Sequence, residues 1–308
     1  MKRILVTGCS GLLGLNLALQ ACEKHTIIGV VQQHGLYGAP FQTVQLDLSL
    51  PGVLEKLLDT SKPDLVIHCA ALANLDLCEE NPQLAHRLNA AVPGELAEMT
   101  ARRDIAMLHI STDAVFDGQR GNYSENDPPN PINVYARTKL DGELAVASAN
   151  PKALIARVNF YGWSLFGKRS LAEWFFNDLS AGKQVNGFTD VFFGPLLVND
   201  LADLLLEMAD KSLCGLYQAV SGAYLSKYEF GRLLARQFGL DESLIKPVSW
   251  QDVGLLAVRS PNLTLRSDKL QQALGRPLPD QISAMSRFHE LYVRGFQKRV
   301  RSFSQQVD

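Results

Sequence analysis

The sequence predicts an α/β fold: a doubly wound parallel sheet with helices on both faces, followed by a smaller α/β lobe toward the C-terminus. Two observations predict it. Short β-branched runs alternate with helical patterns through the first half of the chain, and a glycine-rich turn joins the first run to the first helix. The length of 308 residues exceeds a single core and favours one large unit with an appended lobe, or two domains.

Six apolar runs in the first half are the predicted strands. They are Arg3–Thr7, Thr26–Val31, Gln42–Leu46, Leu65–Cys69, Ile105–Ser111 and Ala153–Val158. The helical patterns between them span Leu12–Lys24, Pro51–Leu58, Pro82–Arg102 and Val134–Ala147. This regular alternation indicates βαβ units and therefore a parallel sheet.

The alternation stops after Val158, where the aromatic-rich stretch NFYGWSLFGKRSLAEWFF begins. We therefore expect a first domain over residues 1–158. A helical pattern over 194–209 is expected to return to that domain. A second lobe is then expected from residues 159–193 and 210–308.

Composition and charge exclude several classes of protein. The 30 basic and 32 acidic residues give a net charge of −2, and the basic residues are scattered, so nothing favours nucleic acid as a partner. No segment approaches the roughly eighteen apolar residues of a membrane span. The five cysteines are odd in number and lack the close pairs of zinc or redox sites, which predicts no metal centre and a cytoplasmic protein.

The glycine-rich turn VTGCSGLLG follows the first predicted strand and opens a helix. Glycine allows a tight turn, the close approach of a pyrophosphate to main-chain N–H groups, and close packing of the helix on the sheet, while the helix N-terminus attracts the anion. This context predicts a Rossmann-type dinucleotide-binding domain over residues 1–158. The expected contacts in the turn are Gly8, Ser10, Gly11, Leu12, Leu13 and Gly14.

The end of the second predicted strand bears on which dinucleotide is bound. It reads VVQQH, without the acidic residue that an NAD site places there, and no arginine stands nearby for a 2′-phosphate. Gln32 and His34 are the expected contacts. The sequence favours NADP(H) and leaves NAD(H) open as a second cofactor. Asp47, next to Leu48, either lies beside the adenine amino group or caps a helix before Pro51.

The fourth predicted strand runs into HCAALA. Small residues at a strand end let a cofactor pass close to the backbone. Cys69, Ala70, Ala71 and Ala73 are therefore expected along the cofactor channel. His68, inside the strand, is expected to be a core histidine.

The fifth predicted strand ends in HISTDAVFDG, which places Ser111 and Thr112 at the carboxyl edge of the sheet, where ligands of such folds bind. A later helix carries Tyr135 and Lys139, whose spacing puts both on one face. A lysine ammonium within roughly 4–6 Å of a phenol lowers the phenol's pKa from about 10 and brings a general acid toward working pH. We expect Thr112 to polarise a carbonyl, Tyr135 to protonate it, and Lys139 to tune the tyrosine and hold cofactor ribose hydroxyls.

The strings TGCSGLLG, HCAA, STDAVFDG and NPINVYARTKLDGE together resemble the extended short-chain dehydrogenase/reductases, most closely the dTDP-4-dehydrorhamnose reductase branch. The resemblance is strong over residues 1–160 and loose beyond. It implies that Thr112, Tyr135 and Lys139 are the catalytic triad and that Asn89 supports the active site. The implied reaction is reduction of the 4-keto group of a nucleotide-activated deoxy sugar by NADPH or NADH. A homodimer is left open.

The second half departs from that branch. After the sixth strand the chain reads RVNFYG, closer to the sugar-nucleotide epimerases, and FFGPLLVND stands where the reductases carry a Gly-Ser-Pro-Thr turn. We assign residues 159–193 and 210–308 to substrate binding. The expected substrate contacts are Ser111, Asp113, Asn159 and Trp163, and further pocket candidates are Trp174 and Arg266.

Two other interpretations stay open. The first is an epimerase or dehydratase that retains a tightly held NAD, although dehydratases place an acid pair beside Thr112 and here Asp113 is followed by Ala114. The second is a non-catalytic subunit similar to the regulatory subunit of methionine adenosyltransferase. The intact set of Thr112, Tyr135 and Lys139 counts against it, because a pure scaffold has no physical need for these residues.

Overall fold

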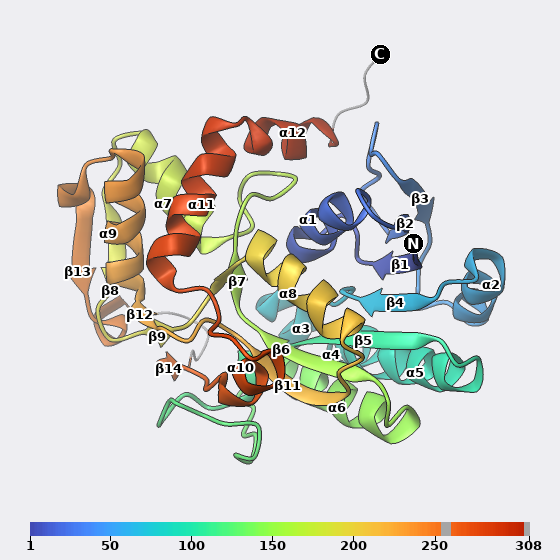
Figure 1. The fold of residues 1–308 in the computed structure, drawn as a ribbon. Coiled ribbons are helices and arrows are strands. Elements are labelled where there is room, and N and C mark those ends of the chain that lie inside the picture. Colours follow the sequence, from blue (N-terminus) through green and yellow to red (C-terminus); the bar gives the residue numbers. More distant parts are fainter. Residues whose placement is uncertain (254–259, 305–308) are drawn as a thin grey trace.

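The central sheet of the first lobe consists of seven parallel strands (Figure 1). They are β1 (Arg3–Thr7), β2 (Thr26–Val31), β3 (Gln42–Gln45), β4 (Leu65–His68), β5 (Ala106–Thr112), β6 (Leu154–Val158) and β11 (Gly215–Ala219). The computed structural model describes residues 1–253 and 260–304. The strand order is β11-β6-β5-β4-β1-β2-β3: β2 and β3 are added on one side of β1, and β4, β5, β6 and β11 on the other, so the strand order reverses between β1 and β4. This reversal confirms the predicted doubly wound sheet and opens a crevice at the carboxyl ends of β1 and β4.

Helices cover both faces of this sheet (Figure 1). One face packs against α1 (Leu12–Ala21) and α8 (Val198–Asp210). The other packs against α2 (Val53–Ser61), α5 (Val92–Arg102) and α6 (Val134–Ala149). The remaining helices of the first 158 residues are α3 (Leu75–Glu80) and α4 (Pro82–His86).

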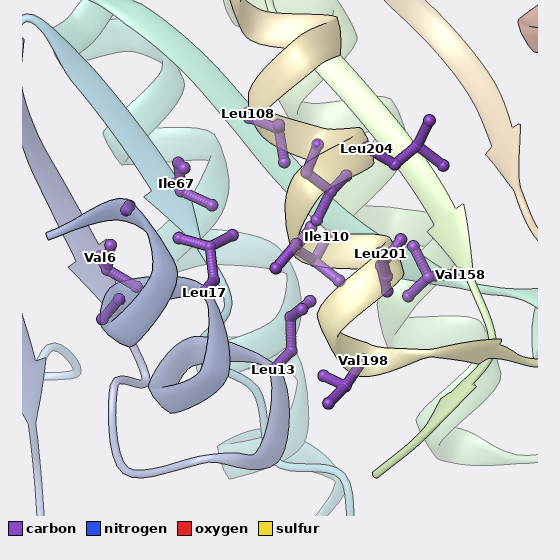
Figure 2. Packing of buried hydrophobic residues seen from close by; sticks show 14 of the residues in the cluster. Val6, Leu13, Leu17, Ile67, Leu108, Ile110, Val158, Val198, Leu201 and Leu204 are labelled. Atoms are coloured by element: carbon purple, nitrogen blue, oxygen red, sulfur yellow. The ribbon is translucent and has the colours of Figure 1, made fainter. Parts of the chain in front are cut away.

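The core between the sheet and the α1/α8 face is made of branched aliphatic side chains. Figure 2 shows Leu13 and Leu17 of α1 and Leu201 of α8 among the side chains of the strands. All three are at most 3% exposed. Burial of each leucine contributes about 1.5–3 kcal/mol. The strand residues labelled there are Val6, Ile67, Leu108, Ile110 and Val158.

A π-helical turn over Arg87–Ala91 interrupts the helix that the sequence predicts over Pro82–Arg102. Pro93 explains the interruption, because proline has no N–H to donate to the carbonyl of Asn89 four residues earlier. The backbone of the π turn lies directly against α6. A Cβ on Gly142 would stand 2.1 Å from the Asn89 carbonyl oxygen, so only glycine permits this approach.

The second lobe is built around aromatic side chains between helices and short strands. Trp163, Phe175, Phe230 and Phe288 are fully buried there. The helices are α7 (Leu171–Ser180), α9 (Lys227–Phe238) and α11 (Gln281–Val293). The strands are β7 (Phe160–Tyr161), β8 (Val185–Phe188), β9 (Phe192–Phe193), β10 (Leu196–Leu197), β12 (Leu225–Ser226), β13 (Ile245–Val248) and β14 (Asn262–Leu263).

The C-terminal third is more divided between the lobes than the sequence predicts. Residues 210–308 were expected in the second lobe, but β11 pairs with β6 and forms the edge of the main sheet. Leu270 of α10 (Asp268–Leu274) and Val300 of α12 (Phe296–Ser302) join the core of the first lobe. Apart from these segments, we propose the predicted domain organisation: residues 1–158 and 194–209 in the first lobe, and residues 159–193 and the remainder of 210–308 in the second.

Within residues 1–253 and 260–304, no helix combines the length and the apolar character needed to cross a membrane.

Replacing Gly142 by alanine is expected to lower the free energy of unfolding by about 1–3 kcal/mol, because the new methyl group overlaps the Asn89 carbonyl. Urea unfolding of the two proteins measures the difference. Gly222→Ala is the matched control, since the nearest atom to its Cβ lies at an ordinary 3.7 Å. Equal unfolding midpoints for Gly142→Ala and Gly222→Ala would contradict the argument.

Candidate active site

A cavity of about 670 Å³ opens at the carboxyl ends of β1, β2 and β4, at the point where the strand order of the sheet reverses. It is lined by loop residues that follow these strands and by leucines that follow β3. Ten of the predicted cofactor residues line it: Gly8, Ser10, Gly11, Gln32, His34, Leu48, Cys69, Ala70, Ala71 and Ala73. The sequence motifs therefore meet on one surface, as their positions at strand ends predict.

The glycine turn has the shape that a pyrophosphate requires. Gly8 has φ +65°, and a Cβ there would stand 2.8 Å from the backbone of Ala70. A Cβ on Gly14 would stand 2.4 Å from the Gly8 carbonyl oxygen. Glycine at both positions keeps α1 and the turn close to the sheet.

The first turn of α1 offers main-chain donors to an anion. Gly11 is its N-cap residue, and the N–H of Leu15 is the first to bond back to the Gly11 carbonyl. The N–H groups of Leu12, Leu13 and Gly14 precede that bond and have no carbonyl within the helix. These donors, with the positive end of the helix dipole, fit the pyrophosphate of a dinucleotide.

Asp47 stabilises a turn. Its Oδ1 accepts hydrogen bonds from the N–H of Ser49 at 2.9 Å and from the hydroxyl of Ser49 at 2.7 Å. These bonds hold the pKa of the Asp47 carboxyl below its usual range. The cavity is lined instead by its neighbours Leu46 and Leu48. Contact between Asp47 and adenine stays a prediction.

Thr112, Tyr135 and Lys139 come together at the end of β5. The Nζ of Lys139 donates to the carbonyl of Ile110 at 2.7 Å, and Lys139 is 3% exposed. Thr112 lies close enough to the phenol of Tyr135 to affect its pKa. The side chain of Asn133 caps α6 by accepting from the N–H of Ala136 at 2.8 Å, which fixes the first turn of the helix and with it Tyr135.

The pKa values at this site differ from the sequence expectation. Burial raises the pKa of Tyr135 to about 12, and the neighbouring Thr112 only partly opposes the rise. Burial also lowers the pKa of Lys139 to about 8. The expectation that Lys139 lowers the pKa of Tyr135 is wrong here, because desolvation dominates and the ammonium bonds to the Ile110 carbonyl. The phenol is therefore protonated at neutral pH, as a proton donor must be.

Asn89 links the cofactor channel to the catalytic helix. Its Oδ1 accepts from the N–H of Leu72 at 2.8 Å, and its Nδ2 donates to the Leu72 carbonyl at 3.0 Å and to the hydroxyl of Thr138 at 3.1 Å. Thr138 precedes Lys139 in α6. Asn89 thus positions α6 against the loop after β4, and it does so from the π turn.

Asp113 and Asn159 are also brought to Thr112. The hydroxyl of Thr112 donates to Oδ1 of Asp113 at 3.2 Å, and the amide of Asn159 donates to Oδ2. Burial raises the pKa of Asp113 to about 6, and these two bonds oppose the rise. Contact of this pair with substrate stays a prediction; in the structure Asp113 bonds to both Thr112 and Asn159.

Ser111 belongs to an internal network that the sequence analysis missed. Its hydroxyl donates to Glu143, which also accepts two bonds from Arg157, at 2.9 and 2.7 Å. All three side chains are buried, and Ser111 is directed into the protein rather than toward a substrate. Glu143 follows Lys139 by four residues, so the i, i+4 spacing in KLDGE was the available signal.

Three predicted pocket residues lie away from the cavity. Trp163 is fully buried and stacks on Phe288 at 4.3 Å between ring centroids, so the expectation of a substrate contact is not supported. Its large apolar ring completes the core of the second lobe. Trp174 is 41% exposed beside Phe175, and Arg266 pairs with Asp268 on the surface.

Arg169 is a charged cavity residue that had no sequence signal. Arg169, in the loop between β7 and α7, lines the same cavity as Gln32 and His34. The sequence analysis found no arginine near the end of β2, because Arg169 reaches it only through the tertiary fold.

Comparison with known proteins places this geometry in a family. The model of the RmlD substrate binding domain matches residues 1–293. A "probable low-salt glycan biosynthesis reductase" of Haloferax volcanii is 33% identical over 91% of this chain and 96% of that protein. A dTDP-4-dehydrorhamnose reductase of Mycobacterium tuberculosis is 32% identical over 92% and 91%. Methionine adenosyltransferase 2 subunit beta of Mus musculus is 30% identical over 88% and 82%.

Solved structures agree on the fold. A dTDP-4-dehydrorhamnose reductase from Clostridium acetobutylicum has a TM-score of 0.81 and 26% identity, covering 94% of this chain and 99% of its own. One from Bacillus anthracis, in complex with NADP, has a TM-score of 0.82 and 24% identity, covering 95% and 99%. The chain belongs to the RmlD substrate binding domain family, within the extended short-chain dehydrogenase/reductases that its motifs resemble.

Proposed function

We propose that this protein is an NADPH-dependent reductase of the 4-keto group of a nucleotide-activated deoxy sugar. The convergence of Thr112, Tyr135 and Lys139 at the end of β5 carries the proposal. None of the three lines the cavity, but Lys139 interacts electrostatically with Cys69, which does. Family membership supports it, since relatives over most of the chain are named reductases.

The cofactor supplies a hydride to the carbonyl carbon when it is bound. Tyr135 donates its phenolic proton to the carbonyl oxygen, so that a C–H bond and an O–H bond form and the ketone becomes an alcohol. Its raised pKa keeps that proton in place until the oxygen becomes more basic than the phenol. Thr112 lies beside the phenol and contacts the same carbonyl oxygen. Asp113, which bonds to both Thr112 and Asn159, orients Thr112.

Lys139 keeps a positive charge below the tyrosine. Glu143, four residues later, favours the ammonium form, and burial opposes it. We propose that the ammonium holds the ribose hydroxyls of the cofactor, for which it offers up to three N–H donors. The hydrogen bonds that Asn89 makes to Leu72 and Thr138 hold α6, and with it Lys139, in register with the cofactor channel.

NADPH is the proposed cofactor because the end of β2 carries Gln32, Gln33 and His34 where an NAD site carries an acid. A structure of the same fold from Bacillus anthracis was solved with NADP. The five free cysteines fit a reducing cytoplasm, which is the proposed location. A homodimer rests on the family resemblance alone.

A regulatory subunit is the second candidate, favoured by the likeness to methionine adenosyltransferase 2 subunit beta over most of the chain. A stable stoichiometric partner in pull-down, with no turnover of any sugar nucleotide, would establish it. Bound dinucleotide in the purified protein without net NADPH consumption would instead indicate an epimerase or dehydratase.

Tyr135→Phe is expected to reduce kcat by about 10²–10⁴, because the proton donor is lost while the ring remains. The assay follows NADPH oxidation with a panel of nucleoside-diphospho-4-keto-6-deoxy sugars. Tyr224→Phe is the matched control, since Tyr224 is 54% exposed and belongs to the loop before β12, away from Thr112 and Lys139 in the chain. A Tyr135→Phe enzyme as active as its parent would exclude this mechanism.

The value of kcat/KM for reduction is expected to fall as pH rises through about 8. Burial lowers the pKa of Lys139 from 10.5 to about 8, so the ammonium is present below that pH and lost above it. Lys139→Arg keeps its charge and should move the decline to higher pH, whatever its absolute rate. The measurement is kcat/KM against pH for both enzymes, together with NADPH binding to the parent. A parent profile that stays flat to pH 10 would refute the assignment.

A further inference from the structure

The loop between β7 and α7 crosses from the second lobe to the cofactor cavity. Its Trp163 carbonyl accepts a hydrogen bond from the side chain of Asn16 in α1 at 3.0 Å. The ring of Phe166 packs edge-on against His34, with 4.8 Å between centroids. Arg169, three residues later, lines the cavity (Figure 1 shows this loop extending toward α1).

Buried hydrogen bonds hold this loop in one shape. The carboxylate of Glu173 is fully buried and accepts from the N–H of Ser164 at 2.8 Å, from the hydroxyl of Ser164 at 2.6 Å and from the N–H of Arg169 at 3.1 Å. The side chain of Asn177 donates to the Gly167 carbonyl at 2.7 Å. The backbone of Arg169 is therefore fixed although its side chain is exposed.

The guanidinium of Arg169 is available to a ligand. In the described part of the chain it makes no ion pair or side-chain hydrogen bond, and no carboxylate lines the cavity. Arg169 is the permanent cation among the lining residues. Gln32, Gln33 and His34, which line the same cavity, are polar and carry no negative charge that could pair with it. An exposed arginine without a fixed partner is usually a solvated surface residue. Arg169 differs because its backbone is held by Glu173 and its side chain lines the cavity.

We propose that Arg169, with His34 and Gln32, forms a subsite for the 2′-phosphate of NADPH, so that the second lobe selects the cofactor bound by the first. This rests on the proposed function. A phosphomonoester carries a charge of about −1.5 to −2 at neutral pH and three acceptor oxygens. A guanidinium meets such a group with two parallel N–H donors. The 2′-hydroxyl of NAD offers no charge for Arg169 to bind.

The test measures binding of two matched pairs of ligands to the purified protein by calorimetry: NADPH against NADH, and 2′,5′-ADP against 5′-AMP. Arg169→Met should weaken NADPH and 2′,5′-ADP by about ten- to a hundredfold, the effect of one charged hydrogen-bonded pair, and leave NADH and 5′-AMP within about twofold. Arg169→Lys should restore part of the loss. Lys168→Met, at the neighbouring exposed position, is the control and should change none of the four.

Two results would overturn the proposal. In one, Arg169→Met weakens both members of each pair equally, which would place its effect on the fold or on the shared adenosine. In the other, 2′,5′-ADP binds the parent no better than 5′-AMP, or Arg169→Met binds it as the parent does. Because these measurements need no sugar, a parent that shows the expected pattern but reduces no sugar nucleotide would refute the proposed function and support this subsite. If the parent reduces a sugar nucleotide with NADPH and Arg169→Met does so equally well, the proposed function would be supported and this subsite refuted.

Discussion

The approach of α6 to the π turn is the constraint on which the active site depends. Gly142 has no side chain, and the Asn89 carbonyl occupies the space where a Cβ would stand. That single contact sets how deeply α6 lies against the sheet. Because α6 carries Tyr135, Lys139 and Glu143, its depth determines whether the phenol reaches Thr112 and whether the ammonium reaches β5. Pro93 creates the π turn, so one proline and one glycine together fix the geometry of the proton donor.

Glu143 extends this constraint into the sheet. Its carboxylate binds Ser111 of β5 and Arg157 of β6, so one buried side chain of α6 holds two strands. Burying the ion pair costs desolvation energy, and removing one partner leaves an uncompensated charge. The arrangement therefore favours geometric precision near Thr112 over net stability. The face of α6 toward the sheet therefore combines apolar contacts of Val146 with the polar contacts of Lys139 and Glu143.

Sequence patterns predicted the elements whose structure depends on neighbouring residues in the chain. The first two strands were predicted at their observed bounds, and the glycine turn, HCAALA and the strand end of β5 meet where the sheet order requires. The π turn was missed because Pro93 is compatible with either a helix start or an interruption. β11 was missed because GLYQA is short and half polar, and its burial depends on pairing with β6. Trp163 next to a strand end fits a pocket wall or a core equally well, and only packing decides. Arg169 was out of reach, because no pattern near β2 points to a loop of the other lobe.

The chain passes between the two lobes several times before it ends. β11 forms the edge of the sheet, and Val300 of α12, close to the last described residue, joins the core cluster that also contains α1 and α8. On a ribosome, the N-terminal lobe therefore remains without its outer strand until β11 has been made, and without part of its core until α10 and α12 have been made. Folding by domains in the order of synthesis is then not available to this architecture. The core that contains α1 and α8 is completed only when Leu270 of α10 and Val300 of α12 are added. The same contacts join the cofactor lobe to the lobe that contributes Arg169.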